Sequence, residues 1–74
     1  MPCIKIINGT KIYIYARDHN PPHFHAKIAE FEELIIIESL ETYSGQLPSK
    51  YRKKIIDWAV QNKSYILKQW KKLN

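Results

Sequence analysis

The N-terminal part of the chain alternates between apolar and polar positions, as a β-hairpin does. Residues 3–17 read CIKIINGTKIYIYAR, with Asn8-Gly9 near the centre. Both of these residues tolerate positive φ, so we predict a two-residue type I′ turn. The expected cross-strand pairs are Ile7 with Thr10, Lys5 with Ile12 and Cys3 with Ile14. One face of this hairpin is mostly apolar and the other partly so, and we expect both faces to be partly covered.

A loop and a third strand follow the hairpin. Pro21 and Pro22 donate no backbone hydrogen bond and favour extended geometry, so residues 18–22 are predicted to form a loop. Residues 23–28, HFHAKI, alternate like a strand, with Phe24 on one face and both His23 and His25 on the other. Two histidines are therefore expected to project from one strand face.

The next segments contain the remaining strands. The acidic cluster Glu30, Glu32 and Glu33 indicates a turn. Residues 34–38, LIIIE, form a short apolar run that is typical of a strand buried on both faces. Residues 39–47 are predicted to form a turn and a short last strand that bends at Gly45.

The period of the pattern changes to a helical one after Pro48. Ser49 is the expected N-cap of a first helix. Asn62-Lys63-Ser64 interrupts or kinks the pattern, and a second helical stretch carries an apolar stripe at Ile66, Trp70 and Leu73. We therefore predict one α+β domain over residues 1–74. It has a small antiparallel sheet of four or five strands with an N-terminal hairpin, packed by two C-terminal helices.

Length and composition narrow the class of protein. A chain of 74 residues, 45% of them hydrophobic, can fold around a small core but has no room for a deep pocket. A second copy of the chain could therefore complete a functional site. The single Cys3 excludes an internal disulfide, and no segment suits a signal peptide or a membrane span. We expect a cytoplasmic protein without a membrane partner.

The net charge of +5 is concentrated in the last third of the chain. Residues 1–48 hold four basic and six acidic side chains, whereas residues 49–74 hold eight basic side chains and Asp57. A basic helical face can contact RNA or other nucleic-acid phosphates, or an acidic protein partner, and it can equally be a solvated surface. The candidate phosphate contacts are Lys50, Lys53, Lys54, Lys68, Lys71 and Lys72.

The motif DHNPPHFH at residues 18–25 is the main candidate for chemistry. His23 and His25 can bind one divalent ion such as Zn²⁺ or Ni²⁺, with Asp18 and His19 as further ligands. In the alternative interpretation, the histidines hydrogen-bond the loop backbone. Asp18 can likewise cap the loop amides, as short polar side chains do beside prolines.

The same motif also suits acid–base catalysis, because imidazole titrates near neutrality. In an enzyme of this kind, His23 and His25 would act as acid and base, Asp18 would orient one imidazole, and Arg17 would contact phosphate. The motif positions His19, Asn20, Pro21 and Pro22 would shape the binding loop. The residues leave metal and proton chemistry open, and they leave open whether the protein is an enzyme.

An interaction module is the competing hypothesis. The second face of the hairpin carries Ile4, Ile6, Tyr13 and Tyr15, so it can present apolar surface or an open strand to another chain. Such a module would bind a protein partner through its sheet edge without catalysis.

The sequence resembles the domain-of-unknown-function 4160 family, part of which is described as the DhiT toxin of a type II toxin–antitoxin module. The resemblance rests on Met1-Pro2-Cys3-Ile4, on the unbroken block from Asp18 to His25, and on Gly45-Gln46-Leu47-Pro48. Asp57-Trp58-Ala59 and Trp70 extend it along the whole chain.

The resemblance implies a small toxin that a cognate antitoxin neutralises, often a member of the domain-of-unknown-function 2442 family. It carries over no catalytic residues, so the motif positions are where an active surface is expected. The stretch KSYILKQWKK departs from relatives, whose second helix tends to be acidic. The basic face is therefore expected to be particular to this chain.

Overall fold

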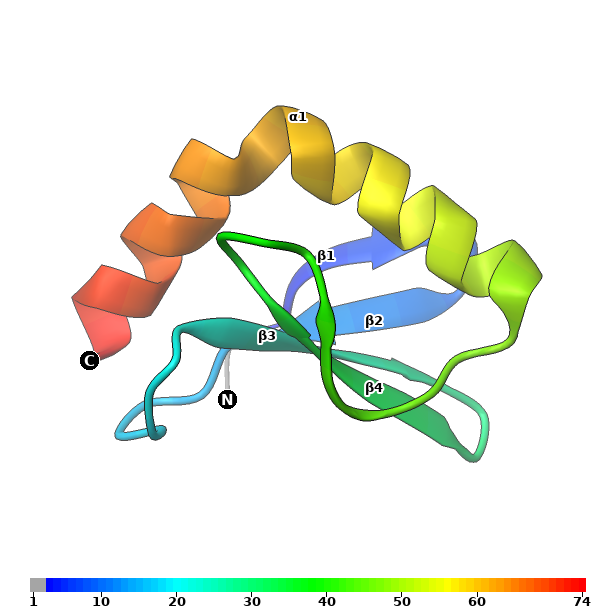
Figure 1. Ribbon diagram of the computed structural model, residues 1–74, viewed down its shortest axis with the longest axis horizontal. Helices are drawn as coiled ribbons and strands as arrows, with labels where there is room; N and C mark the ends of the chain where they lie inside the picture. Colours follow the sequence, from blue (N-terminus) through cyan, green and yellow to red (C-terminus); the bar gives the residue numbers. More distant parts are fainter. Residues whose placement is uncertain (1–2) are drawn as a thin grey trace.

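The computed structural model describes residues 3–74 as a five-stranded sheet and one long helix. The strands are β1 (Cys3–Ile7), β2 (Thr10–Tyr13), β3 (His23–Ile28), β4 (Phe31–Ile36) and β5 (Thr42–Gly45). They are neighbours in chain order and every pair is antiparallel. The helix α1 (Ser49–Leu73) passes over one face of this sheet (Figure 1). The predicted α+β class and the antiparallel sheet are confirmed.

The first hairpin turns at Asn8 and Gly9, whose φ angles are 49° and 83°. The pairs Ile7–Thr10 and Lys5–Ile12 form as predicted. The predicted pair of Cys3 with Ile14 is wrong, because the register shifts between Cys3 and Lys5 and Cys3 pairs with Tyr13 instead. A bulge of this kind adds one residue to one strand and moves every later pair by one position.

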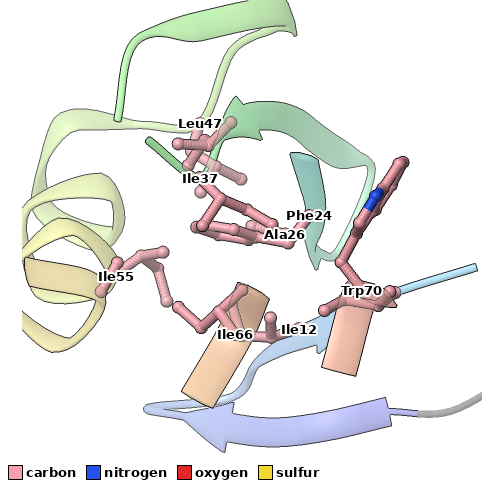
Figure 2. Close-up of a cluster of buried hydrophobic side chains, with 11 residues drawn as sticks. Ile12, Phe24, Ala26, Ile37, Leu47, Ile55, Ile66 and Trp70 are labelled. Carbon is pink, nitrogen blue, oxygen red and sulfur yellow. The ribbon is translucent and has the colours of Figure 1, made fainter. Parts of the chain in front are cut away.

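The core lies between α1 and the inner face of the sheet. Ile12, Phe24 and Ile35 are fully buried on the sheet side, and they meet Ile55 and Ile66 from the helix. Figure 2 shows Ile12 and Phe24 from the sheet and Ile55 and Ile66 from the helix pointing into the same layer. Burying one such side chain stabilises the fold by about 1.5–3 kcal/mol, so this single layer is the main source of stability.

The prediction of two C-terminal helices is wrong, because one helix runs through the expected break. Within α1 only Asn62 departs from helical geometry, with φ −130° and ψ 21°. Its side-chain amide donates a hydrogen bond of 2.7 Å to the carbonyl of Trp58, one turn earlier. The result is a kink that lets both halves of α1 face the core. The helix begins after Pro48, and Ser49 is its first residue rather than a side-chain cap.

Only Glu30 of the acidic cluster lies at the predicted turn, whereas Glu32 and Glu33 lie in β4. The turn is at residues 29–30, and Glu33 lies within β4 with a fully buried side chain. Its carboxylate accepts hydrogen bonds from the Leu47 N–H (3.0 Å), from Arg52 Nε (2.8 Å) and from the Thr42 hydroxyl. Burial alone would raise the pKa of Glu33, but these bonds and the charge of Arg52 hold it below its ordinary value. Glu33 therefore ties the start of α1 to the sheet.

The last strand ends at the bend predicted for Gly45, where φ is 76°. A Cβ at this position would overlap the carbonyl oxygen of Glu32, so the close approach of β4 and β5 requires glycine. In the part of the chain that the structure describes, no helix has the length and apolar character needed to cross a bilayer.

Candidate metal centre

Three residues of the motif meet at one end of the sheet. Asp18 lies in the loop that joins β2 to β3, while His23 and His25 are the first and third residues of β3. One carboxylate oxygen, Asp18 Oδ2, is 3.1 Å from His23 Nε2 and 3.1 Å from His25 Nε2. One ligand atom from each of the three residues lies within 4.8 Å of the others.

His23 is held in a buried position although it is a polar side chain. None of its surface is exposed, and its ring packs against the rings of Trp70 and Tyr43 at centroid distances of 5.3 and 5.4 Å. Nδ1 lies 2.7 Å from the carbonyl oxygen of Pro21, which can only accept. Nε2 is close to Asp18 but not aligned for a hydrogen bond, so it has no hydrogen-bond partner among the described residues.

His25 has a carboxylate on each side of its ring. Nδ1 lies 3.1 Å from Glu32 Oε2, and Nε2 lies 3.1 Å from Asp18 Oδ2. The edge of the ring packs against Tyr15 at a centroid distance of 4.4 Å. Lys27 Nζ is 3.7 Å from the same Glu32 oxygen, so Glu32 also has a positive neighbour. These contacts fix the plane and direction of the imidazole.

Asp18 is anchored on both its backbone and its side chain. Its N–H donates to the side-chain oxygen of Asn74 at 2.7 Å, and Oδ1 accepts from the N–H of His19 at 2.9 Å. Burial alone would raise the pKa of Asp18. The hydrogen bond with His25 and the bond from the His19 N–H hold this pKa below its ordinary value instead. The carboxylate is therefore ionised at neutral pH with Oδ2 directed at the two imidazoles.

Asn74 connects the end of α1 to this loop. Its side-chain amide donates to the carbonyls of Tyr15 (3.2 Å) and Trp70 (3.1 Å), while its oxygen accepts from Asp18. Figure 1 shows the C-terminal end of α1 and the loop at the same end of the molecule. Arg17 lies between Tyr15 and Asp18, the two loop residues that Asn74 hydrogen-bonds, and has a positive φ of 57°. Asn74 thus holds a loop conformation that few non-glycine residues adopt.

The other predicted site residues lie around this centre rather than in it. His19 is exposed, and its ring nitrogen Nδ1 lies 3.1 Å from Asp18 Oδ1, the oxygen that does not face His23 and His25. The Pro22 carbonyl accepts from the N–H of Ile37 at 3.0 Å, and the Asn20–Pro21 peptide bond is cis. Arg17 and Asn20 line a surface cavity beside Asp18.

The predicted basic residues are all exposed along α1, and one of them, Lys71, lines the same cavity as Arg17.

Sequence reasoning missed Glu32 and Asn74 as partners of the motif. A signal for Glu32 was present, because a β-hairpin with its turn at residues 29–30 places Glu32 on the same face as His25. Asn74 gave no such signal, since its position depends on the path of the whole helix.

The comparison with family models gives one match. The family is described as Domain of unknown function (DUF4160), and its model matches residues 9–71. This range includes the complete motif and nearly all of the helix. No curated protein and no solved structure gives a significant match to the chain. Because the match covers most of its length, the chain belongs to the DUF4160 family.

Proposed function

We propose that the protein binds one divalent transition-metal ion through Asp18 Oδ2 and the Nε2 atoms of His23 and His25, and that this centre carries a hydrolytic activity. The observation that supports this most strongly is the orientation of the two imidazoles. Each Nδ1 faces an acceptor outside the centre, and each Nε2 faces the same carboxylate oxygen.

The acceptors determine which ring nitrogens carry protons. A carbonyl such as that of Pro21 and a carboxylate such as that of Glu32 both require Nδ1–H as the donor. His23 then presents a lone pair at Nε2 beside the Asp18 carboxylate, where this nitrogen has no hydrogen-bond partner among the described residues. His25 Nε2 hydrogen-bonds the same carboxylate oxygen, and a metal ion among the three atoms would replace that hydrogen bond. Outer acceptors on the far nitrogen are also the usual support of metal-binding histidines.

The distances and ligand types agree with this assignment. Zinc binds imidazole nitrogen and carboxylate oxygen at about 2.0–2.2 Å, so ligand atoms at tetrahedral angles around one ion lie about 3.3–3.6 Å apart. The two separations of 3.1 Å are slightly shorter, so the ligands would move apart by a few tenths of an ångström, and all three ligand atoms lie within 4.8 Å of one another. Two histidines and one carboxylate leave coordination positions open, as in catalytic zinc and non-haem iron sites. A metal bound there would lower the pKa of a coordinated water or polarise a substrate oxygen.

Replacing Glu32 with glutamine tests the supporting contact of this centre. The neutral amide is a weaker acceptor for the His25 Nδ1–H, so the zinc affinity should fall about tenfold or more while the fold is retained. The affinity is measured by competition with a chromophoric chelator, and the fold by circular dichroism. Glu30→Gln, an exposed change of the same charge in the adjacent turn, is the control and should bind as the native chain does. Equal affinities in both variants would contradict the role of Glu32.

The biological role that we propose for this activity is that of a cytoplasmic toxin in a type II toxin–antitoxin module. Support comes from membership of the DUF4160 family and from the complete DHNPPHFH motif, which forms the proposed centre. The cellular target would be reached through the open side of that centre.

Expression in a bacterial host tests the toxin role. The native chain should arrest growth, whereas His25→Ala at the same soluble level should not. The His19→Ala variant is the matched histidine control and should still arrest growth, because His19 faces the other oxygen of Asp18. Growth unaffected by the native chain would contradict the toxin role. Growth arrest by the His25→Ala variant would show that toxicity does not depend on the proposed metal centre.

We also propose that a partner protein, such as a cognate antitoxin, binds the side of the sheet that α1 leaves uncovered. Exposed apolar residues there and at the strand ends support this, namely Ile6, Phe31 and Tyr43, which are 58%, 41% and 41% exposed. Apolar side chains of this size are frequent where one protein contacts another. Co-purification with a co-expressed antitoxin, lost in an Ile6→Lys/Tyr43→Lys variant, is the expected result.

A further inference from the structure

A surface cavity of about 580 Å³ borders the proposed centre. The loop contributes Arg17, Asp18 and Asn20 to its wall, and the end of α1 contributes Trp70, Lys71 and Asn74. Asp18 therefore belongs both to this cavity and to the centre. A ligand in the cavity would have one end next to the metal.

The charges in the cavity are mostly positive. Arg17 and Lys71 come from different elements, both are exposed, and within residues 3–74 neither forms an ion pair. Among the described residues of the wall, the only acidic side chain is that of Asp18, whose Oδ2 is directed at the two imidazoles. The side chain of Asn20 adds a polar group, whereas the carboxamide of Asn74 is engaged with Tyr15, Trp70 and Asp18. Two unpaired cations and one carboxamide suit an anion that also accepts hydrogen bonds.

The backbone at Arg17 has a positive φ, and contacts from Asn74 hold it in this conformation. A positive φ is unfavourable for a non-glycine residue, and strained residues of this kind cluster at binding and catalytic sites. Here Asn74 offsets this strain through two hydrogen bonds. It donates to the carbonyl of Tyr15, two positions before Arg17, and accepts from the N–H of Asp18, the next residue. The same asparagine lines the cavity. Asn74 thus holds the loop so that Arg17 lines the same cavity as Lys71.

We infer that this cavity binds the phosphate group of a phosphate ester, next to the metal held by Asp18, His23 and His25. The inference deepens the proposed function by naming its substrate class. Guanidinium and ammonium groups are the main phosphate ligands in proteins, and arginine binds phosphate through two parallel hydrogen bonds. The volume is in the usual range for small-ligand sites, about 300–1000 Å³, so it also accommodates an organic group such as a nucleoside.

Isothermal titration calorimetry of the full chain, kept metal-free with a chelator, tests this inference. The probes are inorganic phosphate, adenosine 5′-monophosphate and the dinucleotide ApA, which carries one internal phosphodiester. We expect the native chain to bind adenosine monophosphate or ApA more tightly than phosphate alone. The preferred nucleotide shows whether the cavity takes a terminal or an internal phosphate.

The decisive variant is Arg17→Gln/Lys71→Gln. It should weaken binding of the preferred nucleotide more than about tenfold, since two charge-assisted hydrogen bonds are lost. The control Lys50→Gln/Lys54→Gln removes the same charge at the other end of α1 and should change the affinity by less than about twofold. Equal losses in the two variants would show diffuse charge attraction and overturn the inference. So would a native chain that binds none of the three probes.

Zinc titration of the same proteins separates this inference from the metal proposal. Arg17→Gln/Lys71→Gln should bind zinc as the native chain does, because neither side chain contacts the three proposed ligands. Nucleotide binding by a chain that fails to bind zinc would support the cavity and contradict the centre. Zinc binding by a chain that binds none of the three probes would support the centre and contradict the cavity.

Discussion

Replacing His25 with alanine should reduce the zinc affinity of the protein by more than about 100-fold, because it removes one of three proposed ligands. Loss of a residue that only supports a ligand already costs about 10–100-fold, so loss of the ligand itself should exceed that range. The His25 side chain is 13% exposed and lies on the sheet face opposite the core, so the variant should fold. His23 is a poorer choice, since its ring is fully buried and alanine there would leave a cavity.

His19→Ala is the matched control for this experiment. It also removes one imidazole from the motif, but His19 is 64% exposed and contacts the oxygen of Asp18 that points away from the centre. Its zinc affinity should stay within about threefold of the native value. Chelator competition gives the affinities, and thermal unfolding verifies that both variants are folded. A similar loss in both variants would add His19 to the ligands, whereas no loss in His25→Ala would assign the motif to hydrogen bonding alone.

Much of the fold could be predicted because its signals are local. Asn8-Gly9 set the first turn, and the alternation in residues 23–28 placed His23 and His25 on one face of β3. The spacing of the motif thus predicted that His23 and His25, two of the three residues of the proposed centre, share one strand face. Asp18 could only be named as a candidate, because its direction depends on how the loop is anchored.

The missed features depend on contacts between residues far apart in the chain. Asn74 reaches Asp18 across 56 positions, so no short pattern could connect them. The single helix was missed for a different reason. Asn62 has a side chain that competes with helical hydrogen bonding, which favours a break, yet the buried residues Ala59 and Ile66 on either side hold both halves against the sheet. Tertiary packing outweighs the local preference here.

Glu33 was assigned to a turn because it belongs to an acidic cluster. The alternation contained the opposite signal, since Glu33, Ile35 and Ile37 lie two apart and therefore share one face. A carboxylate on the core face requires a buried partner. That partner is Arg52, which lies 19 positions away on the first turns of α1 and which the sequence indicated only as one of the eight basic side chains of residues 49–74.

Replacing Arg52 with methionine should therefore lower the free energy of unfolding by about 3 kcal/mol at pH 7. Removing one partner of a buried ion pair leaves an uncompensated charge, here on a carboxylate with no exposed surface. The expected value is at the low end of the range for buried pairs, because a third of the Arg52 side chain is exposed. Urea unfolding followed by tryptophan fluorescence measures it. Lys53→Met removes the same charge from the next, exposed position and should cost less than about 0.5 kcal/mol.

The difference in free energy of unfolding between the native chain and the Arg52→Met variant should depend on pH. A loss of packing alone would not produce this pH dependence. In the native chain the pKa of Glu33 is lowered, so its contribution to stability is present above the ordinary glutamate pKa and is lost as the pH falls through the folded-state value. Without Arg52, only the bonds from the Thr42 hydroxyl and the Leu47 N–H oppose the effect of burial, so the pKa of Glu33 should be higher in the variant and its carboxylate should contribute less stability. The gap between the two proteins should then be largest at neutral pH and shrink toward pH 4. A gap that stays constant over this range would assign the effect of Arg52 to side-chain packing and contradict the ion pair.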